Sequence, residues 1–406
     1  MFKVSDRNVR RYPKKGLSPL VIALIAFVVV LALIVALIAG VWLWFKNYKP
    51  SLDTDTPPFN VNATPGPDDT SDDDDANTSG DEYIRDTQVV NFLVAGRDKA
   101  AWNTDVMMLV SFNMHDYTLN VLQIPRDTYI EVDGVTRGRI NTLVKLMRAR
   151  AYNEDSSLNS DEMLKAGMQG TVDILEKNMC IQIDGYAIVN LEGFRNIINA
   201  IGGVYMNVPY AMEYDDPDQG LHIYLAPGPQ TLNGEQAEMF VRYRSGYVQG
   251  DIGRVDAQKI FLTALFKQLQ NNLTISTVPT IVDQLLKYVT TDVPLTDIVF
   301  YAKELLKVDM ENVSMMTLPG GDARSATTGA WYYIMHRADM LNAVNEYFNV
   351  YNKDITDELF DTDHVFTDED YDVFANIYFA EATGATVETA DKIDDGEMTI
   401  PLLPRG

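Results

Sequence analysis

The longest apolar stretch of the chain runs from Leu20 to Phe45 and contains no charged residue in its 26 positions. A helix of that length is about 39 Å long, which exceeds the roughly 30 Å of a hydrocarbon core and permits a tilted crossing. A cleaved signal peptide would have a shorter apolar run and a small-residue cleavage site. The pattern therefore favours one transmembrane helix, a signal anchor over residues 17–45.

The charges around this stretch predict its orientation. Residues 1–16 hold six basic side chains and one acidic one, and only Lys46 and Lys49 follow the apolar run closely. By the positive-inside rule, the basic end, residues 1–16, is cytoplasmic. We therefore expect a cell-membrane protein whose remaining residues, from about 46 onward, lie outside the cell.

Short apolar runs later in the chain predict strands. Three of them are Val89–Ala95, Val106–Phe112 and Leu119–Ile124, each bounded by polar or turn-forming residues. Dense Val, Leu, Ile and Phe over five to eight positions is typical of strands in a buried sheet. A fourth strand is expected at Tyr186–Asn190.

Helical spacing alternates with these strands. Residues 160–178 begin with a serine and acids and place apolar residues at helical intervals. Leu191–Ile201 is expected to be a helix that Gly202 and Gly203 end in a left-handed cap. Long helices are expected at 254–271, 278–289 and 295–307. This alternation predicts a layered α/β domain whose helices cover a central sheet.

Two acidic segments flank that domain. Residues 46–86 are rich in Asp, Pro, Thr, Ser and Asn without apolar periodicity, which predicts a disordered acidic linker. Residues 350–406 hold fifteen acids and three bases interleaved with Phe and Tyr, and disorder is favoured there, with one aromatic stretch able to dock onto the domain. The predicted catalytic domain is therefore residues 87–349.

Composition excludes several classes of protein. The chain of 406 residues carries a formal charge of −25, opposite to the basic surface that nucleic-acid binding requires. Its one cysteine, Cys180, permits no internal disulfide and no thiolate zinc cage. Most of the negative charge lies in the two flanking segments, so the domain itself is only mildly acidic.

Polar residues cluster where the first strands end. Arg97 and Asp98 follow the first strand, Asp105 begins the second, and Arg126 and Asp127 follow the third. A later cluster comprises Arg242, Arg244, Arg254 and Gln258. Arginine forks match phosphate oxygens, and paired carboxylates can hold a hard divalent cation. A single Arg or Asp of this kind more often forms a surface ion pair or caps a turn. The interpretation as a site for phosphate and a divalent cation therefore rests on the clustering of these residues.

Other residues leave alternatives open. Met107, Met108, Met114 and Phe112 could line a soft apolar cleft, although core packing is the commoner fate of such residues. The four histidines lie outside the polar clusters, and no Ser-His pairing suggests a covalent intermediate.

A series of ordered motifs resembles the LytR-CpsA-Psr (LCP) family of bacterial envelope proteins. In chain order they are AGRD, TDVMML, LQIPRDTYI, GRINTLV, AIGGVYMNVP, LAPGPQTLNGEQAEMFVRYR and GDIGRVDAQKIFL, within residues 89–320. The resemblance implies an α/β/α sandwich with a central mixed sheet, in a domain that lies outside the cell. It implies a Mg²⁺-dependent phosphotransferase that attaches an anionic glycopolymer, such as teichoic acid or capsule, from a polyprenyl-pyrophosphate carrier to peptidoglycan of a Gram-positive bacterium.

The resemblance also implies roles for individual residues. Asp98 and Asp105 match acids that hold Mg²⁺, and Arg126, Asp127 and Arg254 match catalytic positions, with Asp127 a candidate to remove the acceptor's hydroxyl proton. The residues that would bind the pyrophosphate are Arg97, Arg126, Arg139, Arg242, Arg244, Arg254 and Gln258.

Two positions depart from the family pattern. The chain has Asn103 two residues before the second acid and Ala257 just before Gln258, where the family often has arginine. Arg97 is a candidate to replace one of the missing charges. These departures keep open a catalytically idle protein that binds the lipid pyrophosphate or polymer. The older naming of the family implies a further alternative, a membrane-bound transcriptional attenuator.

Overall fold

The computed structural model describes residues 48–52, 83–98, 102–217, 221–248, 250–272, 278–325, 328–362, 365, 367, 377–379, 387–394 and 400. The chain divides into two compact units, Met1–Pro50 and Ser51–Gly406, and the fold below is that of the second. The predicted basic end (1–16) and membrane span (17–45) lie outside the described residues, as does most of the predicted linker. No helix within the described residues is long and apolar enough to cross a membrane.

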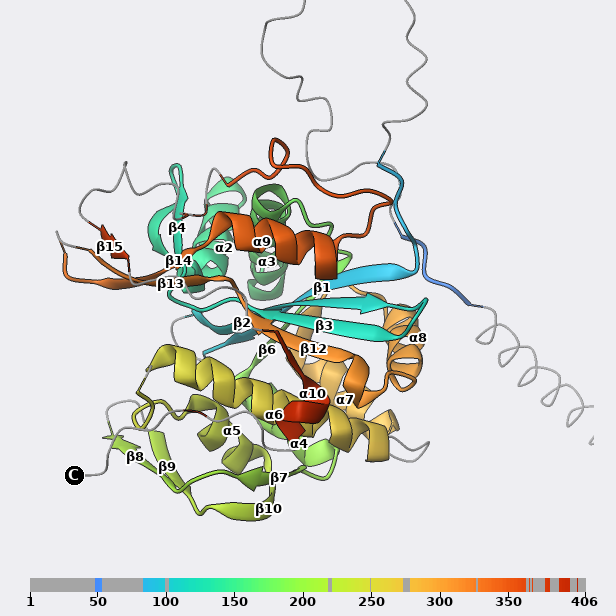
Figure 1. The fold of residues 1–406 in the computed structure, drawn as a ribbon, viewed down its shortest axis with the longest axis vertical. Helices are drawn as coiled ribbons and strands as arrows, with labels where there is room; N and C mark the ends of the chain where they lie inside the picture. The colour runs from blue at the N-terminus through green and yellow to red at the C-terminus, as the bar shows by residue number, and fades with distance from the viewer. Residues whose placement is uncertain are drawn as a thin grey trace, which may run out of the picture. The chain divides into compact units, whose positions relative to one another are not determined.

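The centre of the second unit is a mixed β-sheet (Figure 1). In spatial order, its strands within the described residues are β11 (Val289–Thr291), β6 (Gly185–Asn190), β1 (Val89–Arg97), β2 (Thr104–Asn113), β3 (Thr118–Gln123), β12 (Val313–Thr317) and β16 (Val387–Thr389). The pairs β1–β6 and β3–β12 are parallel, and the other pairs are antiparallel. The predicted strands and the predicted mixed sheet are confirmed.

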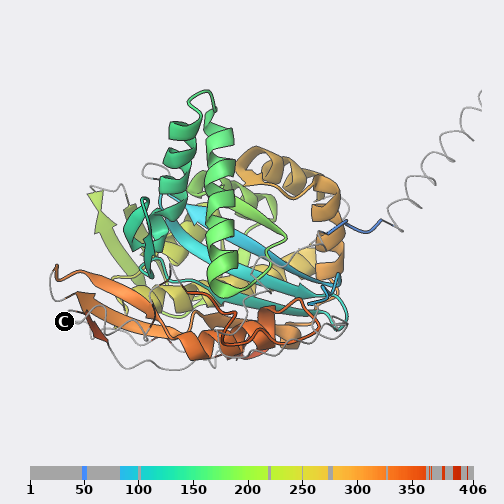
Figure 2. The ribbon, with the colours of Figure 1, turned by 90° about the horizontal axis from the view of Figure 1, so that it is seen from above.

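Helices cover both faces of this sheet (Figures 1 and 2). One face carries α2 (Leu143–Glu154), α3 (Ser160–Met179) and α9 (Arg337–Ala343). On the other side of the sheet lie α4 (Leu191–Ala200), α5 (Gly234–Arg242), α6 (Asp251–Asn272), α7 (Val278–Tyr288), α8 (Leu295–Leu305) and α10 (Ala390–Asp394). Each predicted helix is present, with ends within a few residues of those expected.

Strand alternation divides the core between the two faces. Leu93 and Ala95 pack with α3, whereas Val90, three positions before Leu93, packs with Tyr301 of α8. Successive strand residues point to opposite faces, so both faces of β1 must be apolar. This explains why its sequence reads as a continuous apolar run.

Local sequence signals place the helix ends. Asn159 caps α3 by accepting hydrogen bonds from the backbone N–H groups of Asp161 and Glu162. After α4, Gly202 and Gly203 have φ angles of +85° and +86°, as the predicted left-handed cap requires. A side chain at Gly203 would also meet the carbonyl oxygen of Leu232 at 2.8 Å.

Smaller sheets and short helices complete the domain. They are β4 (Tyr129–Val132) with β5 (Thr136–Arg139), β7 (Val204–Val208) with β10 (Gly228–Leu232), β8 (Met212–Asp216) with β9 (Leu221–Leu225), and β13 (Gly320–Ser325) with β14 (Trp331–Met335) and β15 (Ile377–Phe379). The single-turn helices are η1 (Ile140–Thr142), η3 (Met310–Asn312) and η4 (Val344–Phe348).

The domain extends beyond both predicted boundaries. Before residue 87, Arg85 forms a buried ion pair with Asp184 at 2.6 Å. After residue 349, Ile355 and Phe360 are buried in the core on the α3 face. The prediction of a linker up to residue 86 and of a disordered tail from residue 350 is therefore wrong for these residues, because their apolar and charged side chains find partners distant in sequence.

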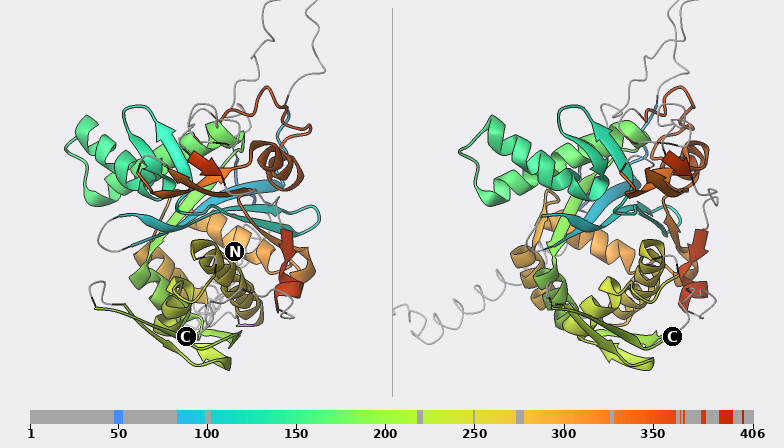
Figure 3. Two further views of the ribbon diagram at one scale, coloured as in Figure 1. Left: turned by 60° about the vertical axis from the view of Figure 1, so that its left-hand side comes forward. Right: turned by 90° about the vertical axis from the view of Figure 1, so that its left-hand side faces the viewer.

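The tail also reaches the helix α6. Strand β16 adds to the edge of the central sheet, and α10 packs beside α6 (Figure 3). Lys259 of α6 is 3% exposed and forms ion pairs with Asp256 at 3.2 Å and with Glu388 of β16 at 3.0 Å. This buried lysine joins the C-terminal segment to α6.

Truncating Lys259 should therefore destabilise the domain strongly. In Lys259→Ala, Asp256 and Glu388 lose their shared cation in a mostly buried site, and we expect the free energy of unfolding to fall by about 3 kcal/mol. Urea unfolding of the full chain measures this. The control is Lys303→Ala, because Lys303 is exposed and lies 3.8 Å from Glu304, so its loss should cost less than about 0.5 kcal/mol. Equal losses in the two variants would contradict docking of the tail.

Candidate functional site

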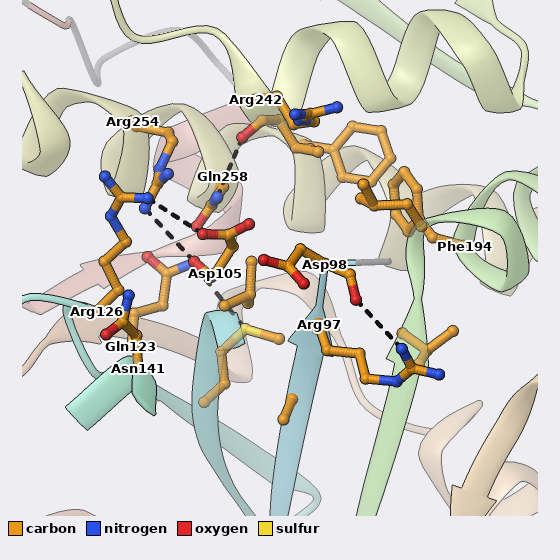
Figure 4. Close-up of a pocket in the computed structure, with 18 of the residues that line it drawn as sticks. Arg97, Asp98, Asp105, Gln123, Arg126, Asn141, Phe194, Arg242, Arg254 and Gln258 are labelled. Atoms are coloured by element: carbon orange, nitrogen blue, oxygen red, sulfur yellow. Dashed lines mark hydrogen bonds and ion pairs between the residues drawn. The ribbon is translucent and has the colours of Figure 1, made fainter. Parts of the chain in front are cut away.

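A cavity of about 450 Å³ opens where the carboxyl ends of β1, β3 and β6 meet the helices α4, α5 and α6. Eight residues predicted for the site line it: Arg97, Asp98, Asp105, Arg126, Arg242, Arg244, Arg254 and Gln258. The remaining two, Asp127 and Arg139, do not line it. The site is drawn in Figure 4.

The two acids lie at the ends of two neighbouring antiparallel strands. Asp98 follows β1 and Asp105 lies at the start of β2, and the backbone N–H of Asp98 donates to the carbonyl oxygen of Asn103 at 3.0 Å. Because β1 and β2 are antiparallel neighbours, this closure brings the two acids to the same edge of the sheet. Figure 4 shows both carboxylates pointing into the cavity.

Asp105 holds two arginines from different elements. Arg126, which follows β3, donates from Nη1 to Oδ1 of Asp105 at 3.1 Å. Arg254, in the first turn of α6, donates from Nη2 to the backbone oxygen of Asp105 at 3.4 Å. Arg254 is only 5% exposed, so its guanidinium is positioned at the cavity wall and cannot move freely into solvent.

Asp127 and Arg139 form a pair next to the cavity. Arg139 Nε lies 3.1 Å from Oδ1 of Asp127, and the same oxygen lies 3.9 Å from Nε of Arg126. Arg139 also donates to the carbonyl oxygen of Trp331. Asp127 is therefore bound closely by Arg139 and only loosely by Arg126, and both Asp127 and Arg139 lie outside the cavity lining.

Helices α5 and α6 present the other arginines and Gln258. Arg242 donates to Glu238 one turn earlier at 2.8 Å, and Glu238 also accepts from Arg195 at 2.9 Å. Gln258 donates to the carbonyl oxygen of Val241 at 3.1 Å, which ties α6 to the end of α5. Arg244, just after α5, is exposed and lines the cavity from there.

The balance of charge in the lining favours an anion. Among the described lining residues, five are arginines and two are aspartates, a formal charge of +3 within a chain of −25. Guanidinium groups held close together repel one another unless an anion lies between them, and their planar forks match phosphate oxygens. The cavity thus brings the predicted arginines together around the two acids.

Much of the remaining lining is apolar. Leu191 and Phe194 of α4 and Phe261, Leu262 and Leu265 of α6 form much of it. In Figure 4, Phe194 lies across the cavity from Arg126 and Arg254. The cavity therefore combines charged groups with an apolar wall, and Arg126 and Arg254 lie on the side away from Phe194.

The methionines predicted as alternatives divide between these roles. Met108 lines the cavity, whereas Met107 and Phe112 are buried in the core on opposite faces of the sheet. Met114 packs at the margin of the core. Core packing, the commoner fate, is confirmed for most of them.

Two amide side chains of the lining were not predicted. Gln123, the last residue of β3, is 2% exposed, and its Oε1 has no hydrogen-bond partner in the described part of the chain. The same holds for Oδ1 of Asn141. Both residues belong to motifs that carried the family resemblance, LQIPRD and GRINTLV. For Gln123, a polar residue at the end of an apolar strand was the sequence feature that could have predicted a place in the site.

The acids fit one kind of metal site. No group of three or more His, Cys, Asp or Glu side chains within the described residues could hold a metal ion by itself. Asp98 and Asp105 both line the cavity, however, and Mg²⁺ is usually held by one or two carboxylates together with water and substrate phosphates. The residues present therefore suit Mg²⁺ that arrives with a phosphorylated ligand.

A family model described as the LytR_cpsA_psr family matches residues 60–349. The chain is also 28% identical over 231 residues to the polyisoprenyl-teichoic acid–peptidoglycan teichoic acid transferase TagV of Bacillus subtilis, an alignment that covers 57% of this chain and 55% of TagV. The chain thus spans little more than half the length of that relative. TagU of Bacillus mycoides, named as the same kind of transferase, is 27% identical over 68% of this chain and 83% of its own.

Solved structures show the same fold. The protein gbs0355 from Streptococcus agalactiae aligns with a TM-score of 0.56 at 21% identity, covering 71% of this chain and 95% of that one. The crystal structure of B. subtilis TagV aligns with a TM-score of 0.50 at 24% identity, covering 62% and 93%. These likenesses support the mixed α/β architecture.

Proposed function

Because the chain belongs to the LytR_cpsA_psr family, we propose that it transfers an anionic glycopolymer, of the teichoic acid or capsule type, from a polyprenyl-pyrophosphate carrier to peptidoglycan. Its relatives TagV and TagU are named as polyisoprenyl-teichoic acid–peptidoglycan teichoic acid transferases. The observation that carries the proposal is one cavity whose lining combines arginines and acids with an apolar wall.

A polyprenyl pyrophosphate likewise combines a charged diphosphate with an apolar chain. Its diphosphate would lie against Arg126 and Arg254. Both arginines are already positioned by Asp105: Arg126 by a 3.1 Å hydrogen bond to its carboxylate and Arg254 by a 3.4 Å hydrogen bond to its backbone oxygen. Its isoprenoid chain would lie along Phe194 and the apolar side chains of α6. Binding both ends at once would select a lipid diphosphate over free phosphate or a neutral lipid.

The transfer itself needs charge stabilisation at phosphorus. A hydroxyl oxygen of peptidoglycan would attack the phosphorus that carries the glycopolymer, forming a phosphodiester as the bond to the polyprenyl phosphate breaks. The hydroxyl proton is released, and the polyprenyl phosphate leaves with the electron pair of the broken bond. Arg126 and Arg254, pre-positioned at the cavity wall, would stabilise the charge that develops on the phosphate oxygens.

We propose Mg²⁺ as the cofactor, held by Asp98 and Asp105. When bound, the ion supplies charge neutralisation to the diphosphate. The two carboxylates would orient the diphosphate relative to Arg126, since Asp105 binds that arginine directly. Asp127 Oδ1 lies 3.9 Å from Arg126 Nε and outside the cavity lining, so Asp127 could act as the base only by moving toward the cavity.

The predicted location is also a proposal. The family assignment and the charge pattern around the apolar run at residues 17–45 support a single-pass cell-membrane protein with its N-terminus in the cytoplasm and residues 87–349 outside. The partners would then be the lipid-linked glycopolymer, peptidoglycan and the membrane, and no nucleic acid.

Replacing Arg126 should stop the transfer. The full chain is incubated with a polyprenyl-pyrophosphate-linked saccharide, peptidoglycan and Mg²⁺, and the saccharide attached to peptidoglycan is measured. In Arg126→Ala we expect the rate to fall at least about a hundredfold, because the developing charge loses a fixed donor. Arg137→Ala is the control, since Arg137 is exposed and pairs with Glu131 outside the cavity. Lipid binding without turnover by the unmodified chain would select the idle binding protein instead.

Removing the metal or one of its carboxylate ligands should also impair the transfer. Chelation by EDTA should abolish the transfer, and added Mg²⁺ should restore it. In Asp98→Asn we expect the Mg²⁺ concentration for half-maximal rate to rise about tenfold, because one anionic ligand is lost. Asp133→Asn, which changes an exposed acid remote from the lining, should leave that concentration unchanged. A transfer rate insensitive to EDTA would exclude the metal.

Protease protection should report the side of the membrane. With protoplasts of cells that express the chain, we expect protease added outside to digest residues 87–349 without detergent, because the positive-inside rule places them outside. Inside-out vesicles from the same cells should protect them. Protection in protoplasts would place the domain in the cytoplasm and favour the attenuator.

A further inference from the structure

Two arginines share one tryptophan ring beside the cavity. The Cζ atom of Arg97, at the end of β1, lies 4.1 Å from the centroid of the Trp102 ring, and that of Arg148, in α2, lies at the same distance. Stacking of guanidinium groups on an indole holds their planes while leaving N–H donors at their edges available. This arrangement is called the Trp102 stack below.

Asp98 and Asp161 act on Arg97 of the Trp102 stack from a distance, without a direct ion pair in the described part of the chain. Within the described residues neither arginine forms an ion pair; Arg97 Nη1 donates to the backbone oxygen of Asp98 at 3.2 Å, and Nε of Arg148 is buried without a hydrogen-bond partner. Burial and the neighbouring charge of Arg148 lower the pKa of Arg97, while Asp98 and Asp161 act in the opposite direction. Two partly buried cations this close favour an anion between or beside them.

The Trp102 stack is held in place by its surroundings. Trp102 has a φ angle of +61°, a backbone conformation that bulky residues rarely adopt unless the structure imposes it. Arg148 lies where α2 packs against α3. The two helices approach closely there because Gly167 of α3 has no side chain: a Cβ added at Gly167 would lie 3.0 Å from the Cβ of Arg148. The paired helices are seen from above in Figure 2.

The Trp102 stack and the apolar lining lie on opposite faces of the sheet. Trp102 packs against the core on the face of α2 and α3, whereas the apolar lining comes from α4 and α6 on the other face. Arg97 lines the cavity as well, and in Figure 4 its guanidinium points away from Arg126 and Arg254. A long ligand could therefore run from the apolar lining, past the acids at the sheet edge, to the Trp102 stack.

We propose that Arg97 and Arg148, held on Trp102, bind a phosphate group in the glycopolymer portion of the donor. The proposal rests on the proposed function, which places the diphosphate at Arg126 and Arg254 and the lipid on the α4 and α6 side. The polymer then leaves the cavity on the remaining side, where the Trp102 stack lies. The substrate class it predicts is a polymer that carries phosphodiesters near its linkage to the lipid.

The test measures binding of a short glycerol-phosphate oligomer, which contains phosphodiesters but no lipid and no pyrophosphate. Titration calorimetry on the full chain in detergent should show about a tenfold loss of affinity in Arg148→Gln, because one charged set of donors is removed, and a smaller loss in Arg148→Lys. Arg150→Gln is the matched control: Arg150 lies on the same helix, is exposed and pairs with Glu154 at 3.0 Å, so the affinity should not change.

A second titration uses inorganic pyrophosphate with Mg²⁺. Its affinity should be the same in Arg148→Gln and in the unmodified chain. If Arg148→Gln weakened pyrophosphate binding tenfold, the Trp102 stack would belong to the diphosphate site and the proposal would be wrong. If the affinity for the oligomer were the same in Arg148→Gln and in the unmodified chain, the proposal for the Trp102 stack would be wrong, but the proposed transfer reaction would still stand. If oligomer binding depended on Arg148 and the chain transferred no donor, only the proposed function would be refuted.

Discussion

The structure of the site depends on Asp105, which lets two arginines approach each other at the edge of the sheet. Its carboxylate accepts from Arg126 and its backbone oxygen accepts from Arg254, so one position on β2 fixes the end of β3 and the start of α6. Without such acceptors, two guanidinium groups in a partly buried cavity would repel each other and turn toward solvent. The carboxylate also makes the same place suitable for a divalent cation, so anion and cation chemistry share one residue.

Helix α6 carries that constraint through the molecule. Arg254 and Gln258 face the cavity, and Lys259, the next residue, points about 100° further around the helix, where it binds Glu388 of β16. The C-terminal segment therefore supports the helix that positions two of the lining residues. This gives a physical reason for an acidic segment after residue 350 to be ordered where it touches α6: the Glu388 carboxylate adds a second ion pair to a buried lysine that otherwise has only Asp256.

Much of the site could be predicted from sequence because strand ends are local features. The apolar runs ending near Arg97 and Arg126 predicted both the strands and the edge at which their polar residues meet. The sequence could not show that Asp127, adjacent to Arg126, turns away from the cavity, since neighbouring residues in a turn project in different directions. It also could not reveal β16, because acidic composition predicts disorder and the partner of Glu388 lies 129 residues earlier.

The two departures from the family pattern have different physical meanings. Ala257 is fully buried in a cluster with Phe240 and Phe261, so an arginine there would need to displace core side chains, and its absence follows from the packing of α6 in this chain. Asn103, in contrast, lines the cavity beside the Trp102 stack, where the positive charge comes from Arg97 on β1. The charge of the cavity is thus retained, but it is directed toward the face of α2 and α3, where a polymer rather than a lipid would leave.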